Sequence, residues 1–139
     1  MDVNRIVSYR YFCNKIWNAT KFGTLFLNIA DADVFVPAES QPINVKSYSN
    51  WDRWILHKLN ECITEVDNSF KNLEFSKATT AVYSFWLYEL CDVYLESIKP
   101  LLKQTATTPE MQTQQRMARE VFYTCIDNGL RLLHPFMPY

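Results

Sequence analysis

The chain has 139 residues, of which 48% are hydrophobic and 15% aromatic, and its formal net charge is −1. This length and composition indicate a single globular domain over residues 1–139, and they exclude a disordered segment. The two glycines, Gly23 and Gly129, are too few for a sheet-rich fold with tight turns or for a glycine-rich phosphate loop. No apolar run is long enough for a membrane span, and the charged N-terminus does not resemble a secretory signal.

Apolar periodicity predicts an all-α fold, a four-helix up-down bundle. The first helix is expected over residues 2–27, and a loop without periodicity follows over residues 28–48. The second is expected over residues 50–72, with Ser49 or Asn50 as N-cap and Asp52 in the first turn, where the helix dipole favours an acid. The third covers residues 76–104, with Ser76 as its cap and Pro100 as an expected kink or end.

The fourth helix is expected over residues 108–134. It begins at Thr107 or Thr108, and Thr107 with Glu110 matches a capping box around Pro109. The links before and after the third helix are short, which favours antiparallel neighbours.

The first helix has two faces of different chemistry. At about 100° per residue, one face is an expected core stripe made of Ile6, Tyr9, Phe12, Cys13, Ile16 and Trp17. The opposite face, expected to meet water, holds Asn4, Tyr11, Lys15, Asn18 and Phe22. Amide and basic donors among aromatic rings suit the edges and faces of unpaired bases. Residues 1–22 carry a net charge of +3, which fits a local basic strip but also an ordinary solvated helix face.

The sequence offers no catalytic or metal site. His57 is expected on a helix surface and His134 at a helix end, and neither follows a glutamate at metal-ligand spacing. Glu89, Asp92 and Glu96 share one helix face, where a solvated surface or pairs with lysines are expected rather than metal binding. The four cysteines, one per helix, have no metal-ligand spacing and sit among apolar neighbours. They are expected as buried reduced thiols, which fits a cytosolic protein.

Three ordered blocks carry a family resemblance: RYFCNKIWNATKF at 10–22, YSFWLYELCDVYLESIKP at 83–100 and LRLLHPFMPY at 130–139. They resemble the eukaryotic-type anticodon-binding domain of the valyl-tRNA synthetases. The resemblance implies that this piece binds the anticodon stem-loop of valine tRNA and packs against the other domains of its parent. The parent would join valine to tRNA with ATP and magnesium. This piece lacks the catalytic H-x-G-H and K-M-S-K-S type motifs, so it is expected to hold no cofactor and to be non-catalytic.

The resemblance also implies which residues meet RNA. Positions near the start of the first helix and near the end of its N-K-x-W-N block would read the anticodon: Asn4, Arg5, Ser8, Asn18 and Phe22. Arg10, Lys15 and Lys21 would contact phosphates, which positions RNA without specifying its sequence. Trp17 is interpreted as packing, and Trp86, Asp92 and Tyr94 as structural. The alternative hypothesis is a helical protein-interaction module that does not bind RNA.

Overall fold

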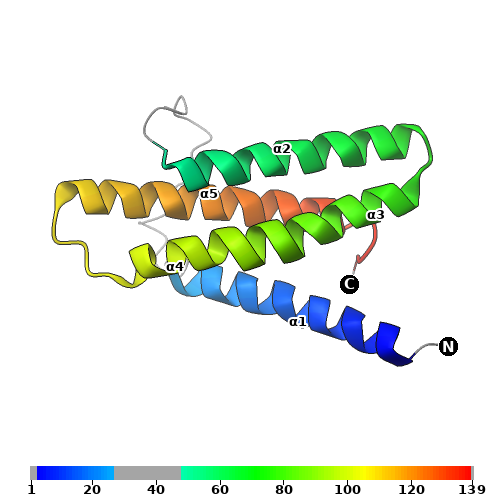
Figure 1. Cartoon of the computed structure of the whole chain (residues 1–139), viewed down its shortest axis with the longest axis horizontal. Helices are drawn as coiled ribbons and strands as arrows, with labels where there is room; N and C mark the ends of the chain where they lie inside the picture. The colour runs from blue at the N-terminus through cyan, green and yellow to red at the C-terminus, as the bar shows by residue number, and fades with distance from the viewer. Residues whose placement is uncertain (1–2, 27–47, 139) are drawn as a thin grey trace.

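The computed structural model describes residues 3–26 and 48–138, with side chains of the first helix placed from Val7 onward (Figure 1). Every regular element in these ranges is helical. α3 (Phe75–Ser84), η2 (Phe85–Tyr94) and α4 (Leu95–Lys103) together form what we call the third rod. α1 (Val3–Phe26) runs in the same direction as the third rod, whereas α2 (Asn50–Lys71) and α5 (Pro109–Leu133) run the opposite way. The predicted all-α up-down bundle is therefore confirmed. The predicted loop, apart from Tyr48, lies outside the described residues.

α2 begins at a complete capping box. The Ser49 hydroxyl accepts a hydrogen bond from the Asp52 N–H at 3.1 Å, and the Asp52 carboxylate accepts one from the Ser49 N–H at 3.0 Å. The second carboxylate oxygen of Asp52 accepts the Tyr94 hydroxyl at 2.6 Å. Asp52 is only 3% exposed. Its carboxylate therefore has two buried roles, because it caps α2 and binds Tyr94 at the end of η2.

The third rod is one continuous helix with an irregular centre. α3 (Phe75–Ser84) passes into a π-helical segment, η2 (Phe85–Tyr94), and then into α4 (Leu95–Lys103). The Leu95 N–H donates to the Leu90 carbonyl, five residues back. An irregularity was expected at Pro100, but Pro100 lies inside α4, and the irregular stretch lies before α4.

One predicted cap is wrong by two residues, and at α5 the cap is the second of the two candidates. The third helix begins before Ser76, because the chain turns at Leu73 in the left-handed region (φ 60°) and the N-cap position falls on Glu74. At α5 the cap is Thr108, whose hydroxyl accepts the Met111 N–H at 3.2 Å, so Thr107 does not form the capping box. Helix ends depend on such local bonds, and one-residue shifts are common there.

The core lies where the third rod meets α2 and α5. Its largest fully buried side chains are Trp86, Tyr94, Phe85 and Phe122. The Trp86 indole N–H donates to the Gly129 carbonyl at 3.1 Å, which brings η2 close to α5. Buried Gln115 donates to the carbonyls of Leu101 and Gln104, which ties α5 to the end of α4. Trp86 and Tyr94 thus have the structural roles expected of them.

Candidate nucleic-acid interface

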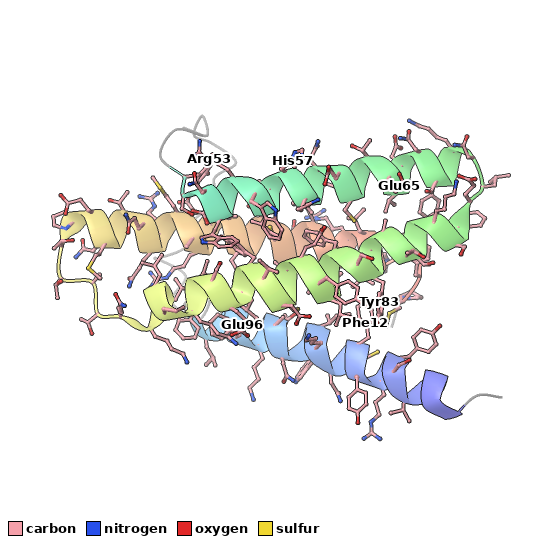
Figure 2. The ribbon with its side chains drawn as sticks, in the orientation of Figure 1. Phe12, Arg53, His57, Glu65, Tyr83 and Glu96 are labelled. Carbon is pink, nitrogen blue, oxygen red and sulfur yellow. The ribbon has the colours of Figure 1, made fainter. Side chains whose placement is uncertain are left out.

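α1 contacts the bundle along a narrow line. The Phe12 ring lies 4.7 Å from the ring of Tyr83 on α3, centroid to centroid (Figure 2). Ala19 is buried, and Gly23 is buried one turn later. Because these two residues are small, the backbone of α1 can approach the bundle closely here. The line of Phe12, Ala19 and Gly23 therefore defines the inner side of α1.

This inner side differs from the core stripe expected from the sequence. Phe12 is buried and Ile16 is partly buried, but Tyr9, Cys13 and Trp17 are exposed. The Ile6 side chain lies outside the described residues. The interpretation of Trp17 as packing is wrong, because its side chain is 70% exposed. The side of α1 that faces the bundle is therefore the side of the small residues Ala19 and Gly23. It is rotated about the helix axis from the side that the bulky apolar residues indicate.

Phe22 was expected to face water, and its expected orientation is wrong. Its ring lies 4.3 Å from the ring of Phe26 and 6.0 Å from the buried ring of Phe122 on α5. The Lys99 ammonium of α4 lies 5.9 Å from the centroid of the same ring. Phe22 is thus partly buried at the junction of α1, α4 and α5.

Lys15 was expected to contact phosphate, but its ammonium pairs with the carboxylate of Asp92 on η2. Both side chains are nearly half exposed, so the pair is worth little in water. Its geometric effect is larger, since it joins α1 to the third rod between the Phe12 and Phe22 contacts. Asp92 therefore has a structural role, as expected.

Five exposed residues form what we call the outer face of α1: Arg10, Asn14, Trp17, Asn18 and Lys21. Four of them follow one another at intervals of three or four residues, so their side chains lie on neighbouring turns. No hydrogen bond or ion pair to another described residue is recorded for their polar groups. Ser8 is exposed and already engaged in an interaction. The side chains of Asn4 and Arg5 lie outside the described part of the helix.

All the charged residues of α1 are positive. α1 contains Arg5, Arg10, Lys15 and Lys21 and no acidic residue. On the other helices several lysines pair with acids: Lys58 contacts Glu61 and Glu89, and Lys99 pairs with Glu96. The acids Glu89, Asp92 and Glu96 are thus paired with lysines, as expected. Positive charge without a matching carboxylate remains at Arg10 and Lys21, where an anionic ligand can neutralise it.

Comparison with known proteins identifies the family. A family model described as the anticodon-binding domain of tRNA ligase matches residues 52–139. The chain belongs to this family. This anticodon-binding domain is 46% identical over 139 residues to valine–tRNA ligase of Takifugu rubripes. It is 49% identical over 140 residues to valine–tRNA ligase of Homo sapiens. Both matches cover the whole chain but only 11% and 10% of those proteins.

A third relative carries an organelle in its name. Mitochondrial valine–tRNA ligase of Mus musculus is 38% identical over 139 residues, covering the whole chain and 12% of that protein. The anticodon-binding domain thus spans about a tenth of the length of each relative named here. The family model begins at Asp52, so it does not include α1. The matches to the three relatives do include α1, because they extend over the whole chain.

Both histidines of the anticodon-binding domain lie at its surface. His57 is exposed, with Nε2 3.3 Å from a Glu61 carboxylate oxygen, and His134 is an exposed C-cap residue. Within residues 3–26 and 48–138 no three His, Cys, Asp or Glu side chains gather as a metal site would require. None of the described helices combines the length and hydropathy that crossing a membrane needs.

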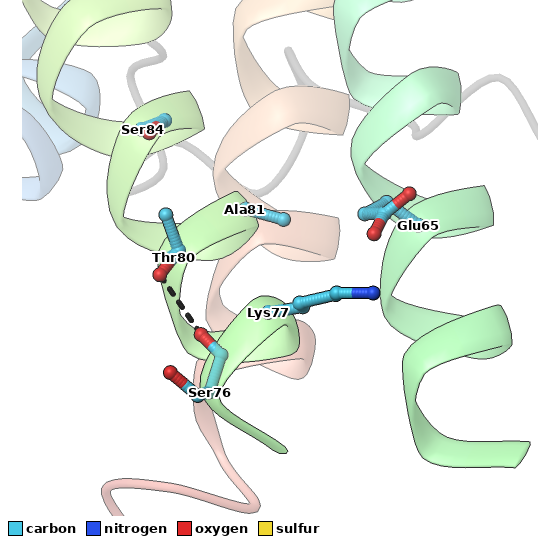
Figure 3. Close-up of a pocket in the computed structure, with 6 residues that line it drawn as sticks. All are labelled: Glu65, Ser76, Lys77, Thr80, Ala81 and Ser84. Atoms are coloured by element: carbon cyan, nitrogen blue, oxygen red, sulfur yellow. Dashed lines mark hydrogen bonds between the residues drawn. The ribbon is translucent and has the colours of Figure 1, made fainter. Parts of the chain in front are cut away.

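A shallow depression of about 310 Å³ lies between α2 and α3, lined by Glu65, Ser76, Lys77, Thr80, Ala81 and Ser84 (Figure 3). The Thr80 hydroxyl donates to the Ser76 carbonyl at 2.8 Å, and the Lys77 ammonium pairs with Glu74. These polar groups are already engaged, and α1 contributes none of the lining residues. The depression is therefore separate from the outer face of α1.

The cysteines of the anticodon-binding domain differ in burial. All four are free, and Cys62, Cys91 and Cys125 are buried, but Cys13 is exposed, contrary to expectation. Burial raises the pKa of Cys62 to about 12 and that of Cys91 to about 11, and it also raises the pKa of Cys125. At pH 8 these thiols remain protonated and unreactive.

We therefore expect a thiol reagent at pH 8 to modify Cys13 rapidly and the three buried thiols only slowly. The number of thiols modified in the first minutes is measured by absorbance and mass spectrometry. Denaturant should release all four for reaction, and a Cys13→Ser variant should lose the rapid phase. Equal reaction rates for all four thiols in the native domain would contradict this picture.

Proposed function

We propose that this domain binds the anticodon stem-loop of valine tRNA through the outer face of α1. The observation that carries the proposal is a helix face of amides and cations, without acids, on a member of the anticodon-binding family. We further propose that its parent protein attaches valine to that tRNA with ATP and magnesium. The other domains of the parent are then its structural partners.

The outer face offers two kinds of RNA contact. The amide of Asn18 can both donate to and accept from a base edge, and so can that of Asn4 at the start of α1. Arg10 and Lys21 can neutralise phosphates, which supplies affinity that depends on salt. Arg5 and Ser8 stay in the proposal as neighbours of Asn4. We remove Phe22 and Lys15, because the bundle engages both side chains.

A titration with the anticodon stem-loop of valine tRNA tests the proposal. We expect binding that weakens with rising salt and that is stronger than binding to a loop with a changed anticodon. Lys21→Ala should weaken binding to both loops. It should also make the negative slope of log K against log salt less steep by about 1. Lys71→Ala is the matched control, because Lys71 is exposed on α2, away from α1, and pairs with Asp67.

Two results would contradict the proposal. One is undetectable binding of the valine stem-loop at millimolar RNA and low salt. The other is binding that ignores salt and tolerates Lys21→Ala, which would favour the protein-interaction module instead, since salt screens charge contacts but not apolar docking.

We also propose that the parent works in the cytoplasm. The identity is 49% to the human valine–tRNA ligase and 38% to the mitochondrial form of Mus musculus. Imaging of the tagged parent protein would test this, and a mitochondrial signal would contradict it.

A further inference from the structure

Trp17 is the most exposed of the four tryptophans. Its side chain is 70% exposed, whereas Trp86 is 1% exposed and has its indole N–H bonded to a carbonyl. Trp54 is partly buried and forms an edge-to-face ring pair with Trp51. No ring contact within the described residues is recorded for Trp17. Exposed apolar residues are common, and α1 also exposes Val7, Tyr9, Tyr11 and Leu25. The residues around Trp17 therefore decide whether it has a role.

These neighbours are hydrogen-bond donors and a cation. Asn14 lies three residues before Trp17, and Lys21 lies four residues after it, so both are adjacent on the helix surface. Asn18 follows Trp17 directly and lies on the flank of the same face. Each of these side chains is exposed, with no partner recorded in the described ranges. A large flat ring thus lies between amides on one side and an ammonium on the other.

We infer that Trp17 is a stacking platform for an unpaired base of the RNA bound on α1. This inference rests on the proposed function and adds a binding residue to it. Every base has a π-face, so a tryptophan ring can stack on any of them, and the stacking supplies affinity with little sequence preference. Asn14 and Asn18 are then placed beside the stacked base, where amides can reach its edge. Lys21, one turn further, meets the phosphate that follows.

Charge favours RNA over a protein as the occupant of this face. Helix-docking surfaces are apolar stripes with anchors one or two turns apart. Val7 and Leu25 are exposed on the same side of α1, and Cys13 is exposed one turn before Trp17. The other exposed neighbours of Trp17 are the polar Asn14, Asn18 and Lys21, and α1 has no acid to repel a phosphate. The outer face therefore matches an anionic ligand with flat, unpaired bases.

The test compares Trp17→Ala, Trp17→Phe and Trp51→Ala in binding to the valine anticodon stem-loop. Trp17→Ala should weaken binding on the order of tenfold, and Trp17→Phe should recover part of the loss because a smaller ring remains. Trp51→Ala is the matched control, since Trp51 is 52% exposed but lies on α2. RNA should also quench tryptophan fluorescence in the unaltered domain, and much less in Trp17→Phe. Circular dichroism checks that each variant stays helical.

The outcomes separate this inference from the proposed function. If Trp17→Ala binds the stem-loop as tightly as the unaltered domain while Lys21→Ala still weakens binding, the stacking role is wrong and RNA binding stands. If the unaltered domain does not bind the stem-loop, both fail. If Trp17→Ala leaves RNA binding intact but loosens the domain from the rest of its parent, Trp17 is a protein contact, and the inference is overturned.

Discussion

Replacing Asp52 with alanine is expected to lower the free energy of unfolding by about 3 kcal/mol. The change removes the capping box of α2, which is worth about 1 kcal/mol. It also leaves the Tyr94 hydroxyl buried without its acceptor, which costs about 1–3 kcal/mol. Both groups are almost fully buried, so water cannot replace the lost hydrogen bond. Chemical denaturation monitored by circular dichroism measures the effect.

Two further variants divide this effect into its parts. Tyr94→Phe should cost about 1 kcal/mol, because the carboxylate keeps its bonds to Ser49. Asp67→Ala, on the same helix, is the matched control: Asp67 pairs with Lys71 in a largely exposed contact, and such pairs contribute between 0 and about 1 kcal/mol. An Asp52→Ala cost no larger than that of Asp67→Ala would contradict the buried network.

Replacing Gly129 with alanine is expected to lower the free energy of unfolding by about 2 kcal/mol. A Cβ at this position would lie 2.9 Å from Cζ2 and 3.0 Å from Cε2 of Trp86. The indole cannot move away freely, because its N–H is bonded to the Gly129 carbonyl and the ring is fully buried. Overpacking of about 1–3 kcal/mol and a weakened hydrogen bond outweigh the roughly 1 kcal/mol by which alanine favours a helix.

A double-mutant cycle with Trp86→Phe tests the mechanism. The phenyl ring lacks the indole atoms that the new Cβ would meet, so Gly129→Ala should be nearly neutral or stabilising in the Trp86→Phe background. Denaturation midpoints of the four proteins give the coupling energy. An equal cost of Gly129→Ala in both backgrounds would show that the clash with Trp86 is not its cause.

Local signals in the sequence predict much of this fold. Ser49 and Asp52 mark the start of α2 because a capping box is completed within four residues. The four helices follow from apolar periodicity over long segments, which local contacts cannot easily override. The π-helical geometry of η2 was not predictable, because the sequence of Phe85–Tyr94 gives no separate signal for it. The bond between Asp52 and Tyr94 joins residues 42 positions apart, and periodicity does not specify such partners.

The candidate site was predicted less well, for a specific reason. Periodicity weighs bulky apolar residues, and on α1 it placed Trp17 inside and Phe22 outside. The bundle instead meets α1 at Ala19 and Gly23, whose small size allows close approach but adds little to a hydrophobic pattern. The outer face holds Asn18, which the sequence predicts to face water. It also holds Arg10 and Lys21, which the family resemblance implies as phosphate contacts. Their contacts with RNA remain a prediction.

The π-helical segment restricts how this protein can evolve. Tyr94 must meet Asp52 of α2, and Asp92 must meet Lys15 of α1. Both depend on the same stretch of helix. Adding or deleting one residue between Phe85 and Asp92 would rotate the later side chains by about 100° relative to the earlier ones, and both contacts would be lost together. We therefore expect length changes among relatives to accumulate in the links between helices, and this segment to keep a constant length.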